Sequence, residues 1–159
     1  NLASLLDTNM DSSLGSGGTH IDTALTTVNG LIGTGSGAVG DGSTPSTPQP
    51  YVFLVTDGAQ DNQTKGVPNG SWSGSNQATV INPTTVCKPL KDRGIIVSVL
   101  YIPYEPISPV NTSFAGNEDT YANNNIPNIP SSLQGCASPG FFYTANTPAD
   151  RERAKLSIR

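Results

Sequence analysis

The sequence predicts an α/β fold: a doubly wound, mainly parallel sheet with helices on both of its faces. Apolar runs without alternation at residues 51–56 and 94–102, with a weaker run at 141–145, are typical of strands buried on both faces of a parallel sheet. Segments with helical features separate these runs, and strands that alternate with helices imply parallel pairing through right-handed crossovers. Ligands of such sheets bind at the carboxyl ends of the strands.

The clearest predicted helix begins near residue 20. Its apolar residues are spaced i, i+3, i+4, i+7, i+10 and i+11, which is one face of a 3.6-residue period. Thr19 is expected to cap its amino end, and Gly33 is expected to end it. The apolar face consists of Ile21, Ala24, Leu25, Val28, Leu31 and Ile32.

The sequence predicts loops and short helices for most of the remaining segments. Residues 33–50 are rich in Gly, Ser, Thr and Pro, which predicts a long surface loop. A short helix is expected over 83–93, and Pro89 inside it should kink or shorten it. A second long loop, rich in Asn and Pro, is expected over 103–128, followed by one or two helical turns at 131–136.

The composition limits the functions open to this chain. It has 159 residues, which fits one domain, and a formal net charge of −4. Its eight Lys and Arg residues are scattered and form no basic stripe, so we expect no nucleic-acid partner. No stretch reaches the roughly 18 apolar residues that span a bilayer. We therefore expect a membrane contact only through an anchor in a missing upstream portion.

The two cysteines, Cys87 and Cys136, bear on the compartment. Low charge, polar loops and a single pair of cysteines suit an oxidising compartment and one disulfide. The alternative is two unlinked buried thiols, since cysteine packs well as a small apolar side chain.

Asp57 is the first candidate for chemistry. It directly follows an apolar strand and precedes a glycine, so its carboxylate is expected at the carboxyl edge of the sheet. There it can bind a divalent cation directly or through water. The alternative is that Asp57 closes a turn by accepting hydrogen bonds from nearby backbone amides.

The glycines before Thr19, the helix that follows and Asp57 within Thr-Asp-Gly together resemble a von Willebrand factor A domain. That family builds a metal-ion-dependent adhesion site from an Asp-x-Ser-x-Ser loop, a Thr before a helix and an Asp after a central strand. The resemblance implies that Thr19 and Asp57 are ligands of Mg²⁺ or another divalent cation. The Asp-x-Ser-x-Ser motif is absent here, and residues 11–13 are only a fragment of it.

The resemblance covers about residues 15–145, the second half of the family fold. It therefore predicts one partial domain over 1–159 that is incomplete at its amino end and similar in its layers to a Rossmann fold. Because two oxygen ligands fall short of an octahedral shell, we expect this chain to bind metal weakly.

A closer likeness is to the TadG-like pilus-assembly proteins of the Flp (tight-adherence) system. It rests on four segments, 51–61, 81–83, 91–96 and 135–140. This family places a von Willebrand A-like domain in the periplasm, held by an amino-terminal inner-membrane segment. Its paired cysteines match Cys87 and Cys136, whereas residues 149–159 do not resemble its final helix and read as a divergent tail.

The likeness implies a non-enzymatic binding and assembly module, in the periplasm or outside the cell. Its expected partners are protein components of a pilus or secretion system. Two other readings stay open: a degenerate structural domain without metal, and a doubly wound hydrolase or phosphoryl-transfer enzyme that uses Asp57. The enzyme reading lacks a second carboxylate, a base or a nucleophile at useful spacing, and His20 is the only histidine.

Overall fold

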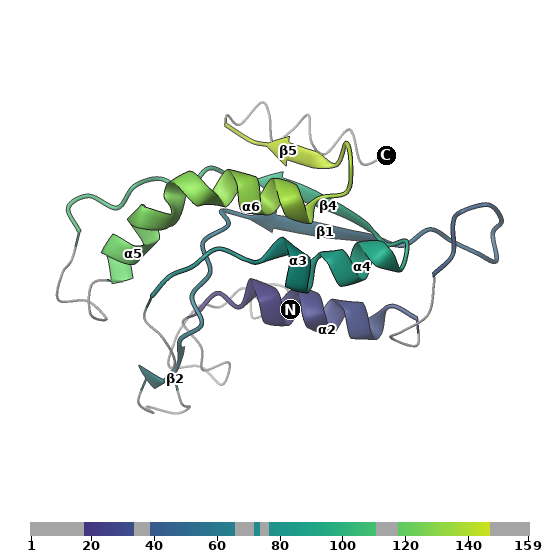
Figure 1. The fold of residues 1–159 in the computed structure, drawn as a ribbon, viewed down its shortest axis with the longest axis horizontal. Coiled ribbons are helices and arrows are strands. Elements are labelled where there is room, and N and C mark those ends of the chain that lie inside the picture. The colour runs from purple at the N-terminus through teal and green to yellow at the C-terminus, as the bar shows by residue number, and fades with distance from the viewer. Residues whose placement is uncertain (1–17, 34–38, 66–71, 74–76, 111–117, 147–159) are drawn as a thin grey trace, which may run out of the picture.

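The computed structural model describes residues 18–33, 39–65, 72–73, 77–110 and 118–146 (Figure 1). The predictions for residues 1–17 and for the tail at 149–159 lie outside this part of the chain. In chain order the elements are α2 (Ile21–Leu31), β1 (Tyr51–Thr56), β2 (Thr64–Lys65), β3 (Trp72–Ser73), α3 (Pro83–Val86), α4 (Lys88–Asp92), β4 (Ile96–Tyr101), α5 (Glu118–Asn125), the 3₁₀ turn η1 (Ile126–Asn128), α6 (Ile129–Cys136) and β5 (Phe142–Thr144).

The main sheet has three parallel strands in the order β1-β4-β5. Tyr51 lies opposite Ile96, and Val99 lies opposite Phe142. All three predicted strands are therefore present at the predicted places, and their parallel pairing confirms an α/β fold. The short strands β2 and β3 pair antiparallel as a separate two-stranded sheet, which no apolar run in the sequence predicts.

Helix α2 begins at Ile21, and the predicted capping role of Thr19 is wrong. His20 occupies the N-cap position, and the backbone N–H of Asp22 donates instead to Oε1 of Gln60 at 2.9 Å. The reason is that the Thr19 backbone is extended and forms a bridge with Asp61. At the other end the helix stops before Gly33, whose φ is +62°, as predicted.

The predicted helix over 83–93 is split into α3 and α4. Asn82 caps α3 by accepting the backbone N–H of Thr84 at 3.0 Å. The break falls at Cys87, two residues before Pro89, because proline has no N–H to donate and its ring clashes with the preceding turn. The expected effect of Pro89 is thus confirmed.

The prediction of a long loop over 103–128 is wrong in its second half, because α5 begins at Glu118 and η1 follows it from Ile126. Asparagine has a low helix propensity, but here its side chains make tertiary hydrogen bonds. Asn123 Nδ2 donates to the carbonyl of Ile107, and the N–H of Ile107 donates to Asn123 Oδ1, both at 2.9 Å. Burial of Ala122 and these bonds hold α5 against its neighbours.

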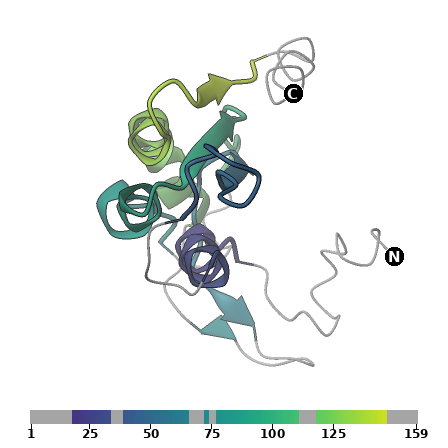
Figure 2. The same cartoon turned by 90° about the vertical axis from the view of Figure 1, so that its right-hand side faces the viewer.

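The core lies between one face of the sheet and the helices. Figure 2 shows α2, α4 and α6 on the same side of the sheet. Burying apolar side chains of helices against a sheet is the main favourable contribution to such a fold. The buried residues of this core are Ile21, Leu25, Val52, Ile81, Val86, Cys87, Leu90, Ile95, Val97, Val99, Tyr101, Ile129, Leu133, Cys136 and Ala137.

The opposite face of β1 is open within the described residues, which corrects the expectation that both of its faces are buried. Val52 is buried, whereas Tyr51, Phe53 and Val55 are 47%, 50% and 59% exposed. An apolar run predicts burial on both faces only if neighbours cover both, and β1 is here an edge strand with helices on one side. The described residues thus show one helical layer.

A disulfide joins Cys87 and Cys136, whose Cα atoms are 5.0 Å apart. Both cysteines are fully buried. The predicted disulfide is confirmed, and the alternative of two unlinked thiols is wrong. The bond connects the break between α3 and α4 to the last residue of α6, and Nζ of Lys91 donates to the carbonyl of Gly135 at 2.6 Å beside it.

Candidate functional site at the carboxyl edge of the sheet

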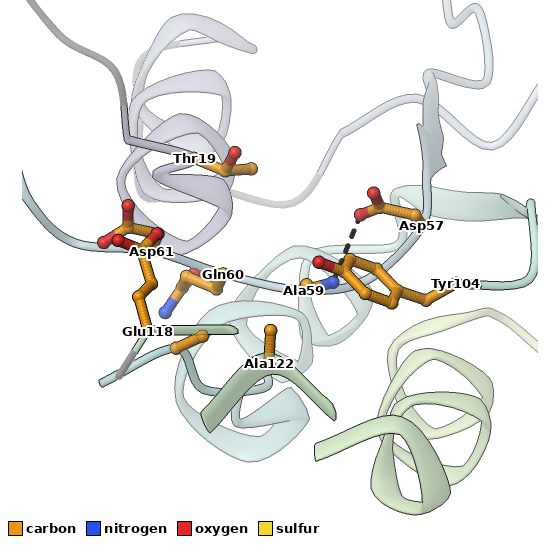
Figure 3. A pocket seen from close by; sticks show the side chains of 9 residues that line it. Thr19, Asp57, Ala59, Gln60, Asp61, Tyr104, Glu118 and Ala122 are labelled. Atoms are coloured by element: carbon orange, nitrogen blue, oxygen red, sulfur yellow. Dashed lines mark hydrogen bonds between the residues drawn. The ribbon is translucent and has the colours of Figure 1, made fainter. Parts of the chain in front are cut away.

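Thr19 and Asp57, which are 38 residues apart in the chain, line the same pocket, whose volume is about 170 Å³ (Figure 3). Thr19 stands just before α2, and Asp57 follows the last residue of β1. Because parallel strands end at one edge of a sheet, the residues after β1 and β4 meet here. The pocket is lined by Thr19, Asp57, Ala59, Gln60, Asp61, Ala78, Tyr104, Glu118 and Ala122.

Asp57 closes a turn. Its Oδ1 accepts the backbone N–H of Ala59 at 3.2 Å, and the N–H of Gly58 donates to Oγ1 of Thr56 at 2.9 Å. The turn that was the alternative interpretation of Asp57 is therefore present. Since a carboxylate has two oxygens and about four acceptor sites, one such bond leaves acceptor capacity toward the pocket.

Gly58 fixes where this turn lies. Its φ of +82° is a backbone conformation that favours glycine. A Cβ at this position would lie 2.4 Å from Cγ2 of Ile129 and 2.8 Å from Cδ1 of Leu133. Only glycine allows this close approach, so the packing of α6 against the chain after β1 sets the place of Asp57.

The segment 60–63 joins the start of α2 to the pocket. The carbonyl of Thr19 accepts the N–H of Asp61 at 3.0 Å, and Nε2 of His20 donates to the carbonyl of Gln63 at 3.1 Å. Gln60 is buried and its backbone pairs with that of Thr79. His20 is half-buried and takes part in this attachment.

The pocket is acidic. The carboxyl groups of Asp61 and Glu118 lie side by side in Figure 3, and Nε2 of Gln63 donates to Oε2 of Glu118 at 3.0 Å. Burial, with the negative charge of Asp61 next in size, raises the pKa of Glu118. Burial, with the charge of Asp57 next, also raises the pKa of Tyr104. A pocket with this field attracts cations and repels anions.

The donor set does not complete a metal site. Within the described ranges, no group of three or more His, Cys, Asp or Glu side chains is arranged to hold one ion. Thr19 and Asp57 supply two oxygen ligands, whereas Mg²⁺ requires about six in an octahedron. The residues present therefore fit a cation only if water or another molecule supplies most of the shell.

Three titratable residues of the pocket were not predicted as site residues: Asp61, Tyr104 and Glu118. Tyr104 lies three residues after the end of β4, whereas Asp57 directly follows β1, so the place of Tyr104 beyond a strand was only a weak signal. Asp61 lies four residues beyond Asp57 on the same connection. Glu118 carried no signal, because it lies in the segment predicted to be a loop.

A second hollow, which we name the α2–β1 groove, runs along the free edge of β1. Its volume is about 330 Å³. It is mainly apolar, and His20 is its one titratable side chain. The lining residues are Thr19, His20, Ile21, Ala24, Leu25, Val28, Val52, Phe53, Leu54, Val55 and Thr56.

Comparison with known proteins gives no relative for this chain. No family model matches it, and neither a curated protein nor a solved structure matches it. Among the helices in the described part, none has the length and apolar character needed to cross a bilayer. The von Willebrand A-like and TadG-like resemblances thus stay predictions that rest on the sequence motifs.

Proposed function

We propose that this chain is a non-enzymatic protein-binding and assembly module, the carboxy-terminal half of a doubly wound von Willebrand A-like domain. The observation that carries the proposal is that Thr19 and Asp57 line one pocket at the carboxyl edge of a parallel sheet. Its partner is a protein component of a Flp-type pilus or secretion system. The buried disulfide supports a periplasmic or extracellular location, because structural disulfides persist in oxidising compartments.

The partner contacts the acidic pocket, and Mg²⁺ or another divalent cation strengthens that contact. Thr19 and Asp57 each supply one oxygen to the ion. Water and a carboxylate of the partner supply the others. Asp61 and Glu118 add negative charge nearby, which raises the local concentration of the cation without coordinating it. On its own, the chain holds the ion weakly.

Site-specific photocrosslinking in cells of the native host tests the partner contact. A photoreactive residue in place of Glu105, which is exposed next to Tyr104, is expected to capture a pilus or secretion-system protein. The same residue in place of Asp92 serves as control, because Asp92 ends α4 near the amino end of β4. Capture of the same protein from Asp92 and not from Glu105 would place the contact at the wrong edge and overturn the proposal.

Titration with Mg²⁺, followed through backbone amide NMR signals, tests the cation. We expect millimolar affinity, shifts centred on Thr19 and Asp57, and loss of those shifts in Asp57→Asn. Asp92→Asn removes one carboxylate far from the pocket and is expected to bind as the unchanged chain does. Micromolar affinity contradicts the incomplete donor set, and shifts that persist in Asp57→Asn contradict the assignment of the site.

The second candidate function is a degenerate structural domain in which Asp57 only closes a turn. The bond from the Ala59 N–H to Asp57 Oδ1 favours it. The thermal midpoint of Asp57→Ala, measured with and without Mg²⁺, separates the two functions. A stability loss that is equal in both conditions supports the structural role, whereas a larger loss with Mg²⁺ supports the cation.

A further inference from the structure

We draw no further inference here: the strongest candidate, the α2–β1 groove with the adjoining bare face of Tyr51, Phe53 and Val55, is an unpartnered apolar surface at the edge of the sheet, and nothing in the structure shows what covers it.

Discussion

Replacing Gly58 with alanine is expected to destabilise the fold through two separable effects. The first is backbone strain, since a side chain at a φ of +82° costs about 1–2 kcal/mol. The second is a steric clash, because the new Cβ would lie 2.4 Å from Cγ2 of Ile129 in the packed core. Overpacking of this kind costs about 1–3 kcal/mol. We therefore expect Gly58→Ala to lower the free energy of unfolding by about 2–5 kcal/mol.

Gly140 offers a matched control for this variant. It has the same φ of +82°, but a Cβ there would meet no atom within 4 Å. Gly140→Ala should therefore cost only the backbone strain of about 1–2 kcal/mol. The difference between the two variants isolates the clash with α6.

Urea denaturation followed by far-ultraviolet circular dichroism measures both variants, provided that the slope of each transition stays unchanged. We expect Gly58→Ala to be less stable than Gly140→Ala by about 1–3 kcal/mol. If Gly58→Ala is as stable as Gly140→Ala, the turn after β1 does not pack against α6 as described, and our account of the position of Asp57 fails.

Three other perturbations test separate features. Replacing both Cys87 and Cys136 with serine frees a loop whose ends are 49 residues apart, which should cost about 4 kcal/mol in urea denaturation; a loss below about 1 kcal/mol contradicts a stabilising bond. Because the pKa of Glu118 is raised above 4.5 in the folded state, its contribution to stability is present below that pH and is lost as the pH rises through the folded pKa. Glu118→Gln should make the free energy of unfolding less dependent on pH in this range and should stabilise the protein at neutral pH by less than about 1 kcal/mol. If the free energy of unfolding depends on pH as it does in the unchanged chain, the pKa of Glu118 is not raised as described. Exposed apolar edge strands promote aggregation, so Val55→Lys on β1 should lower the amount of aggregate seen in sedimentation velocity after heating, whereas Leu31→Lys on α2 should not; equal effects point to net charge rather than to the edge.

The sequence predicted the three strands of the main sheet because each lies in a largely apolar run, whereas β2 and β3, of two residues each, lie in no such run. It could not predict how many neighbours a strand has, and for that reason the open face of Phe53 and Val55 was expected to be buried. Burial depends on which elements pack together in space. The apolar sequence at 51–56 is compatible with either an edge strand or a central strand.

The pocket was predictable only in part. Thr19 and Asp57 carried local signals, a residue before a helix and a residue after a strand, and the structure brings both to one pocket. The role of Thr19 as a helix cap failed because a tertiary bridge to Asp61 outweighs the local preference for a hydroxyl at that position. Glu118 reaches the pocket on α5, a helix held by the side-chain hydrogen bonds of its asparagines, and no local pattern encodes such bonds.

The buried bond between Cys87 and Cys136 has a consequence for the order of events when the protein is made. The disulfide holds the carboxyl end of α6 at Cys136. The amino end of the same helix carries Ile129, which packs on Gly58 beside Asp57. A newly made chain whose thiols are still reduced lacks this restraint on α6. The place of Asp57 in the acidic pocket is therefore expected to become fixed on oxidation, so a protein with the proposed function would gain its binding surface in the compartment that supplies the oxidant.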